Sequence, residues 1–529
     1  SLNSRAPSHL PPSPTDAAAS GDAESSAALS SSSSGWFSLA DRLAGIPLDA
    51  NGDLDPLDQH LMDSQATIEL GAVGHTSHGK TTLVADLTGV HTSKHRDEIA
   101  RNLTIRLGYA NAKLWQCPMC HGAPDSYVTT RSTVTLAAPP TCSRHSDWTP
   151  EPVPMRLVRH VSFVDCPGHE ALMATMINGA ASMDGAMLVI GAQDTCPMPQ
   201  TANHLLALEL MNLDPAAVLV CQNKIDLVDR VRAVASHHEI TTFLASTKVA
   251  ARAPVIPLSA QFKINLEVTR HWIHRRLPVP RRDIRATPRM LVVRSFDVNH
   301  PGTELEDLVG GIAGGTLQRG VLRVGDEIEI RPGIVVMHQP TASRPKGATA
   351  GAPLALPTYE CTPLRSRIVS LKSEQSSLAF VVPGGLIAVG TQLDPALTRG
   401  DRLVGQVIGL PFDMPGICSD LQLEYDMLPS TAAARPMPGG RPAAPSPPKF
   451  AKNELIVLYI GTKDIKATVT SCYVSRKTQA AVVIVRLHYP ACTDLQQRIS
   501  IARRRENRWC LSAVATVVDG NAVQFSAPR

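Results

Sequence analysis

A glycine-rich stretch has the spacing G-x-x-x-x-G-K-[ST] of a phosphate-binding loop. Backbone N–H groups in such a loop turn toward phosphate oxygens, and the N-terminus of the following helix adds partial positive charge. Lys80 would reach the β- and γ-phosphates, and Thr81 would offer its hydroxyl to Mg²⁺. The stretch therefore predicts a nucleoside triphosphate site made of Gly74, His75, Thr76, Ser77, His78, Gly79, Lys80, Thr81 and Thr82.

The residues on either side supply the context that this motif requires. Residues 66–73 read as a strand, and residues 82–89 are apolar at helical spacing and end at Gly89. The same spacing also occurs by chance in ordinary strand–turn–helix corners. Two further nucleotide motifs follow along the chain, and they favour the nucleotide interpretation.

A second motif, Asp165-Cys-Pro-Gly168-His169, follows the apolar alternation of residues 158–164. Asp165 would hold Mg²⁺ through water, and the N–H of Gly168 would read the γ-phosphate. His169 lies where it could orient the attacking water, although a lone histidine after a turn is more often structural. Earlier in the chain, Thr104 is a candidate for a mobile threonine that closes on Mg²⁺ when the γ-phosphate is present. The alternative is that Thr104 simply begins a strand.

A third motif would select the base. Residues 216–221 form a buried strand-like run that leads into N-K-x-D, at Asn223, Lys224 and Asp226. The Asp226 carboxylate can accept from both N1–H and the exocyclic amine of guanine, which adenine cannot offer together. Asn223 would face the guanine carbonyl edge, and the Lys224 stem would cover the ring. After a last strand, backbone N–H groups would donate to guanine O6 from Ser259, Ala260 and Gln261.

Two pairs of metal-ligand residues have the layout of a zinc knuckle. Cys117 and Cys120 are followed, after 21 residues, by Cys142 and His145. Four protein ligands would fill a tetrahedral site, so the zinc would be structural rather than catalytic. His121 is a spare ligand, and the alternative is four unrelated residues in a loop.

The composition of the whole chain limits its class. A length of 529 residues suggests three or four domains of roughly 150 residues each. The net charge of +4 does not indicate a nucleic-acid coat protein, and 4% aromatic residues argue against a base-stacking sheet. Eleven cysteines without a secretion signal indicate a reduced, cytoplasmic protein. No run of about 18 apolar residues occurs, which predicts no membrane span.

The order of the elements predicts an α/β P-loop GTPase domain with a zinc-knuckle insertion, followed by two antiparallel β-barrels. Strands alternate with helical segments over residues 66–280, which is typical of a doubly wound domain. Later strands are short and punctuated by Gly, Pro and Asp, which is typical of barrels. The predicted limits are 64–283 for the GTPase domain, 117–145 for the knuckle, 287–410 and 411–529 for the barrels, and 429–448 for a proline-rich insertion.

Two segments are predicted from composition alone. Residues 1–60 are rich in Ser, Ala, Pro and Asp, and they predict a disordered tail because they offer little apolar surface to bury. An apolar island at 36–48 could be a docking peptide or a chance cluster. The basic run 498–508 could be a solvated face or could contact RNA.

Taken in order, the motifs resemble those of the translational GTPases. Longer stretches are similar to the gamma subunits of eukaryotic initiation factor 2. The resemblance covers roughly residues 55–415 strongly and 416–529 more weakly. It is carried by the cysteine knuckle inside the GTPase domain and by residues 101–112, 159–169, 197–201, 222–226, 294–298 and 310–315.

The resemblance implies a GTP-dependent carrier of methionyl initiator tRNA to the small ribosomal subunit. It implies a heterotrimer with alpha and beta subunits, and initiation factors that activate hydrolysis or exchange the nucleotide. It also implies GTP or GDP with Mg²⁺, a structural zinc, and a pocket for the tRNA acceptor end between the GTPase domain and the first barrel.

Three features depart from the family pattern. Ser77 stands where elongation factors have aspartate. Thr76 stands where the family usually has valine, as part of an apolar gate in front of His169 whose other residue, Leu103, stays apolar. The proline-rich 429–448 replaces a leucine/arginine-rich stretch, so contacts made there cannot be carried over.

The departures at Thr76 and Ser77 motivate a second hypothesis, a non-hydrolysing GTP-binding scaffold of an initiation complex. A third is another tRNA-carrying GTPase, such as an elongation or selenocysteine-specific factor. The cysteine knuckle and residues 101–109 speak against the third hypothesis.

Overall fold

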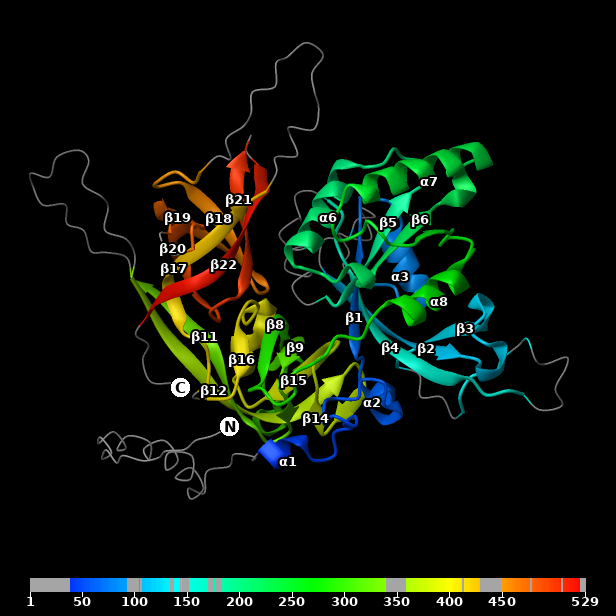
Figure 1. Cartoon of the computed structure of the whole chain (residues 1–529). Helices are drawn as coiled ribbons and strands as arrows, with labels where there is room; N and C mark the ends of the chain where they lie inside the picture. Colours follow the sequence, from blue (N-terminus) through cyan, green and yellow to red (C-terminus); the bar gives the residue numbers. More distant parts are fainter. Residues whose placement is uncertain are drawn as a thin grey trace, which may run out of the picture.

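The computed structural model shows a GTPase-like domain and two β-barrels, and each of the three contacts the other two (Figure 1). No helix in the described part of the chain is both long and apolar enough to cross a membrane. The predicted insertion 429–448 and most of the predicted tail lie outside the described residues. The structure describes residues 39–92, 104, 107–133, 138–142, 144, 152–169, 176, 183–338, 358–411, 413–428, 449–475, 478–505 and 508–523.

The first domain contains a seven-stranded sheet in the order β3-β2-β4-β1-β5-β6-β7. Strands β4, β1, β5, β6 and β7 run parallel, and β2 and β3 add an antiparallel edge. The strands are β1 (Ile68–Val73), β2 (Gly108–Gln116), β3 (Tyr127–Arg131), β4 (Arg156–Asp165), β5 (Gly185–Gly191), β6 (Val218–Asn223) and β7 (Val255–Pro257). The helices are α3 (Lys80–Thr88), α6 (Pro199–Leu210), α7 (Arg230–Ala245) and α8 (Leu266–Arg276).

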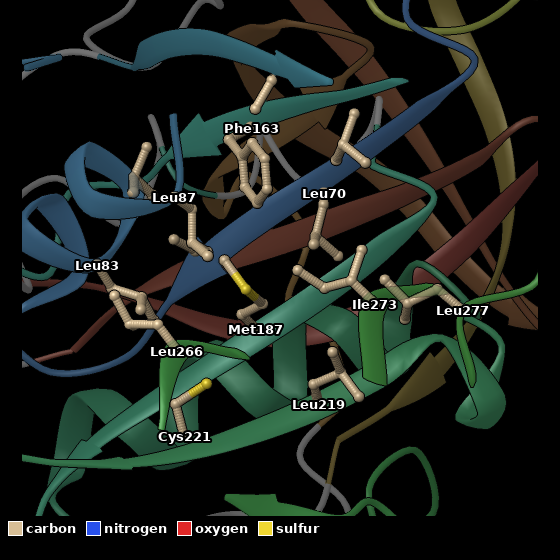
Figure 2. Packing of buried hydrophobic residues seen from close by; sticks show 14 of the residues in the cluster. Leu70, Leu83, Leu87, Phe163, Met187, Leu219, Cys221, Leu266, Ile273 and Leu277 are labelled. Atoms are coloured by element: carbon tan, nitrogen blue, oxygen red, sulfur yellow. The ribbon is translucent and has the colours of Figure 1, made fainter. Parts of the chain in front are cut away.

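Successive residues of the central strands face opposite sides of this sheet, as the pleat requires. Met187 of β5 packs with Leu70 and with residues of α3 and α8, whereas the next residue, Leu188, joins the cluster that includes α6 and α7. Figure 2 shows the first of these layers, with Leu83 and Leu87 of α3 beside Phe163 and Met187. Both faces of the sheet are thus buried, which explains why the central strands read as continuous apolar runs.

The second domain is the first predicted barrel. Six antiparallel strands follow one another as β11-β16-β8-β9-β15-β12, and a β11–β12 pairing closes the ring. The strands are β8 (Arg289–Phe296), β9 (Ile312–Arg319), β10 (Leu322–Arg323), β11 (Glu327–His338), β12 (Thr358–Ser373), β13 (Ser376–Leu378), β14 (Phe380–Val381), β15 (Leu386–Thr391) and β16 (Val407–Gly409), with a short helix α9 (Pro395–Thr398).

The third domain is a closed barrel in the order β17-β20-β19-β18-β21-β22. Its strands are β17 (Ile417–Met427), β18 (Leu455–Ile460), β19 (Lys463–Val474), β20 (Ala481–Cys492), β21 (Arg498–Arg505) and β22 (Arg508–Ala522). The predicted fold class, an α/β nucleotide-binding domain followed by two antiparallel barrels, is therefore confirmed.

The predicted disorder of residues 1–60 is wrong for residues 39–60. This stretch includes α1 (Leu39–Leu43) and leads into α2 (Gln59–Ser64). Ile46 and Leu54 are buried in a cluster with residues of the first barrel and of the linker before it. The buried guanidinium of Arg42 donates to both carboxylate oxygens of Asp326, at 2.9 and 3.1 Å. The partners that bury this stretch lie hundreds of residues away, so its composition could not reveal them.

The three domains contact one another directly. Between the GTPase domain and the first barrel, the N–H of Gly385 donates to the carbonyl of Ala66 at 3.0 Å. Tyr459 of the second barrel shares an apolar cluster with Cys166, which follows β4. Between the barrels, the Thr462 hydroxyl donates to the carbonyl of Val292 at 2.7 Å. Each barrel therefore contacts the domain that carries the predicted nucleotide motifs.

Candidate active site

The predicted phosphate loop connects β1 directly to α3. Gly79 precedes α3 with φ +91°, and a Cβ there would lie 2.3 Å from the side-chain nitrogen of Asn223, so glycine is required. Lys80 is buried, and its ammonium donates to the carbonyls of Gly74 at 3.0 Å and His75 at 2.8 Å. Burial lowers the pKa of Lys80 to about 8, and the negative charge of Asp165 opposes this shift. The loop thus holds a cation that a phosphate group would help to compensate.

A cavity of about 220 Å³ opens beside this loop. Its lining is mostly hydroxyl groups, backbone and ammonium groups, as polyphosphate binding requires. Residues from four separate stretches of the chain meet there, namely Thr76, Ser77, Gly79, Lys80, Thr81, Thr82, Thr104, Gly168 and Lys224.

The three residues predicted to hold Mg²⁺ lie together. The Thr81 hydroxyl donates to Oδ2 of Asp165 at 2.7 Å, and it lies 3.0 Å from the Thr104 hydroxyl. Asp165 is fully buried at the end of β4, while Thr81 lies in the first turn of α3. Two hydroxyls and a carboxylate form the hard oxygen set that Mg²⁺ prefers, so the residues fit this ion.

Gly168 and His169 occupy different positions relative to the cavity. Gly168 lies against the phosphate loop, and a Cβ at this position would be 2.7 Å from the Thr76 nitrogen and 2.5 Å from the Lys80 ammonium. His169 is exposed and does not belong to the lining. Its role in orienting water therefore stays a prediction.

Asn223 makes two contacts that the sequence analysis did not predict. Its amide nitrogen donates to the His78 carbonyl at 2.8 Å, and its amide oxygen accepts from the Ala260 N–H at 3.0 Å. The side chain thus ties the phosphate loop to residues 259–261, and its contact with the guanine carbonyl edge stays a prediction. The short amide reaches both backbones because it stands at the end of β6, two strands from β1.

The other residues predicted to bind the base differ in their exposure to solvent. Lys224 has a left-handed backbone, φ +63°, and lines the cavity. Asp226 is exposed in the short 3₁₀ helix η6 (Ile225–Leu227) that follows. Ser259 and Ala260 are buried, while Gln261 is exposed. Of these residues, Lys224 lies in the lining of the cavity, and the contacts to guanine stay predictions.

Two buried histidines, His204 of α6 and His78 of the loop itself, hold the phosphate loop in place. His204 of α6 accepts the Gly74 N–H on Nδ1 at 2.8 Å, so that nitrogen carries no proton. His78 contacts the Val189 carbonyl and the Asp194 carboxylate, each at 3.2 Å. Burial lowers the pKa of His204 to about 3 and that of His78 to about 4. His204 and Asp194 were missed in the sequence because neither lies in a nucleotide motif.

The structure brings three of the four predicted zinc ligands together. The ligand atoms of Cys117, Cys120 and Cys142 all lie within 4.8 Å of one another, and Sγ of Cys120 is 3.8 Å from Sγ of Cys142. Cys117 directly precedes the turn η1 (Pro118–Cys120) after β2, and Cys120 is the last residue of that turn. The predicted fourth ligand, His145, lies outside the described residues. Three clustered thiols are a donor set that suits zinc.

Comparisons with known proteins agree with this architecture. Residues 65–279 match a family model described as the elongation factor Tu GTP binding domain, and residues 419–517 match one described as initiation factor eIF2 gamma, C terminal. The chain is 43% identical over 475 residues to eukaryotic translation initiation factor 2 subunit 3 of Drosophila melanogaster, covering 89% of this chain and 92% of the relative. It belongs to the family of gamma subunits of eukaryotic translation initiation factor 2.

A fission yeast relative supports the same family. The chain is 40% identical over 479 residues to eukaryotic translation initiation factor 2 subunit gamma of Schizosaccharomyces pombe, covering 89% of this chain and 98% of that protein. Membership makes the chain a GTP-binding initiation factor subunit and a GTPase that uses GTP, GDP and Mg²⁺. The second hypothesis, a scaffold that does not hydrolyse GTP, is set aside by this result.

Solved structures show the same fold at lower identity. A bacterial selenocysteine-specific elongation factor, EF-Sec, superposes with a TM-score of 0.59 at 18% identity, over 86% of this chain and 59% of that one. The factor SelB of Methanococcus maripaludis, in complex with the GTP analogue GppNHp, gives a TM-score of 0.58 at 16% identity, over 87% of this chain and 80% of that one. Identities this low support the shared fold only.

Thr92 is a site residue that the sequence analysis missed. Its hydroxyl donates to Oδ2 of Asp165 at 2.7 Å, the same oxygen that accepts from Thr81. Gly108 leaves room for it, because a Cβ there would lie 2.5 Å from the Thr92 Cβ. No motif marks this threonine, since its partner lies 73 residues away. We infer that Thr92 holds the Asp165 carboxylate in the direction that Mg²⁺ needs.

The Thr92→Val variant should require more Mg²⁺ to bind nucleotide tightly. Loss of one hydrogen bond of about 1 kcal/mol predicts a roughly fivefold higher Mg²⁺ midpoint. The midpoint would be measured by titrating Mg²⁺ against a fluorescent GDP analogue. Thr92→Ser keeps the hydroxyl and should behave like the wild type. An unchanged midpoint in Thr92→Val would mean that this hydrogen bond does not position the carboxylate.

Proposed function

We propose that this chain carries methionyl initiator tRNA to the small ribosomal subunit while GTP is bound, and that it hydrolyses GTP on start-codon recognition. The observation that carries the proposal is that the Thr104 hydroxyl lies within hydrogen-bond distance of the Thr81 hydroxyl, which in turn donates to Asp165. A threonine from a separate stretch of chain, 23 residues after Thr81, reaches the Mg²⁺ residues. Such a residue can respond to the γ-phosphate and pass the change to neighbouring segments.

In this proposal each site residue acts on a defined part of the nucleotide. Lys80 and the backbone N–H groups of the phosphate loop hold the β- and γ-phosphates, and the N–H of Gly168 contacts the γ-phosphate. Mg²⁺, when bound by Thr81, Thr104 and Asp165, would neutralise charge that develops on the phosphate oxygens. His169 orients the water. Asp226 and Lys224 bind the guanine.

Hydrolysis by the chain alone should be slow. Among the described residues, those that line the cavity include no arginine. An arginine that stabilises the transition state raises the rate by about 10³–10⁵-fold in other GTPases. We therefore propose that a partner initiation factor stimulates hydrolysis, and that another exchanges the nucleotide.

The proposed assembly is a heterotrimer with alpha and beta subunits in the cytoplasm. The family name of the relatives, a subunit of initiation factor 2, supports a multi-subunit protein. The direct contacts of both barrels with the GTPase domain supply a route by which nucleotide state could alter a tRNA-binding surface.

The test is filter binding of methionyl initiator tRNA, with GTP and then with GDP. Salt is held at one moderate concentration, because RNA affinity depends steeply on it. Tighter binding with GTP, by roughly tenfold, would support the carrier function. Equal binding in both nucleotide states, in protein that retains GTP, would contradict it. The assay is repeated with the other two subunits present, so that a need for partners is recognised.

We also propose that Cys117, Cys120 and Cys142 hold a structural zinc, with His145 as the fourth ligand. Purified protein should contain one equivalent of zinc by elemental analysis. Cys120→Ser should lose it and unfold at a lower temperature, because a structural zinc contributes directly to folding. Cys472→Ser, in the second barrel, is the matched control and should keep its zinc. Wild-type protein without zinc would contradict the proposal.

A further inference from the structure

We propose that a small phosphate-class anion binds between the two barrels. A cavity of about 250 Å³ lies there, lined from the first barrel by Arg289 and Gln318 and from the second by Lys463, Tyr489 and Asp494. Its lining shares no residue with that of the nucleotide cavity. It is smaller than the pockets of about 300–1,000 Å³ that hold drug-sized ligands, so a compact anion suits it better than a nucleotide.

Arg289 is the central group of this cavity. Only 3% of the residue is exposed, yet its Nε has no hydrogen-bond partner among the described residues. Oδ2 of Asp494 lies 3.6 Å from this Nε, which is an ion-pair distance but too long for a hydrogen bond. Nη1 donates only to the weak sulfur acceptor of Met414, at 3.3 Å. A buried guanidinium in this state lacks the acceptors that normally offset its desolvation.

Positive charge exceeds negative charge in the lining of the cavity. Arg319 approaches the same Asp494 oxygen at 3.7 Å, so one carboxylate lies within ion-pair distance of two guanidinium groups. Lys463 adds a third cation, with Nζ 3.4 Å from the centre of the Tyr489 ring. Burial, the largest influence, lowers the pKa of both Arg289 and Lys463. Asp413 and Asp464 also act on Arg289 and Lys463, but neither carboxylate lines the cavity. The lining itself holds two cations, Arg289 and Lys463, and one carboxylate, Asp494, and this excess of positive charge favours an anion as the missing partner.

Phosphate chemistry matches this arrangement better than a single carboxylate would. A phosphate offers several acceptor oxygens and can bridge a guanidinium and an ammonium at once. Because Arg289 comes from β8 and Lys463 from β19, the anion would join the two barrels. The phosphate could be free in solution or could belong to an RNA backbone, since both present the same oxygens.

The experiment is calorimetric titration of inorganic phosphate into the full chain saturated with a non-hydrolysable GTP analogue and Mg²⁺. The analogue fills the γ-phosphate position as well as the α- and β-positions, so inorganic phosphate cannot bind at the nucleotide loop. Wild-type protein should bind one equivalent. Lys463→Met keeps an apolar stem but loses the charge, and it should bind phosphate roughly tenfold more weakly or worse. Lys466→Met, an exposed lysine on the same strand, is the control and should match the wild type.

Two outcomes would overturn the proposal. One is no binding by wild-type protein at tens of millimolar phosphate, and the other is equal binding by Lys463→Met and Lys466→Met. Unchanged GDP affinity and circular dichroism would show that both variants are folded. Competition with a short single-stranded RNA then identifies the source of the phosphate. Displacement by RNA assigns the site to the RNA backbone, and displacement only by phosphate monoesters assigns it to a free ligand.

Discussion

Replacing His169 with alanine should lower stimulated GTP hydrolysis by roughly 10²–10⁴-fold while leaving GTP binding within about twofold. His169 directly follows Gly168, which lies against the phosphate loop and the Lys80 ammonium. The histidine itself is exposed and lines no part of the cavity, so its removal should not disturb bound phosphates. Its imidazole is expected to reach the attacking water only in the complex that stimulates hydrolysis.

The measurement is single-turnover phosphate release from assembled initiation complexes, with GTP affinity determined separately. His237→Ala removes another exposed histidine of the same domain, on α7, and should leave the rate unchanged. An unaltered rate in His169→Ala would show that a different group orients the water. Thr76→Val, which restores the usual apolar residue of the loop, would then report whether the polar gate affects the rate.

Replacing Asp226 with asparagine should exchange guanine for xanthine as the preferred base. The carboxylate can accept two hydrogen bonds from guanine, whereas an asparagine amide presents one donor and one acceptor. Losing matched, charge-assisted bonds predicts GTP binding that is weaker by roughly 10²–10⁴-fold. Xanthine carries a carbonyl oxygen where guanine carries the amine, so the amide nitrogen of Asn can donate to it.

Competition between GTP and XTP for the nucleotide site measures this exchange directly. Asp229→Asn is the matched control, because Asp229 is also exposed and lies three residues later. Its side chain caps α7 by accepting from the Arg232 N–H, and asparagine can keep that cap. Wild-type preference for GTP should therefore persist in Asp229→Asn. A preference for GTP that also persists in Asp226→Asn would remove Asp226 from the base site.

Local patterns predicted the elements that carry the site. The phosphate loop lies between β1 and α3, as the apolar runs on either side of it indicate. The spacing within each motif was informative because a loop must present its groups to one ligand over a few residues. The change in the spacing of apolar residues after residue 283 likewise predicted the two barrels, because the alternation of apolar and polar residues is a property of each strand by itself.

Contacts between distant residues were not predictable in this way. The motif predicts that Asn223 faces guanine, and the tertiary structure adds that its amide bridges the backbones of His78 and Ala260. Thr92 and His204 have no motif at all, and each acquires its role from one partner far along the chain. A hydroxyl or an imidazole carries no local sign of the group that it will meet.

The sequence by itself determined which chemistry this protein performs, because phosphate, Mg²⁺ and base recognition each require fixed residue types at short, fixed spacings. Only the tertiary structure decided how Ile46 and Leu54 of the stretch at residues 39–60 are buried, what supports the phosphate loop, and that Arg289 and Lys463 line one cavity. These features depend on surfaces that form after separate domains pack together. Burial and unpaired charge are properties of that packing and not of any one stretch of chain.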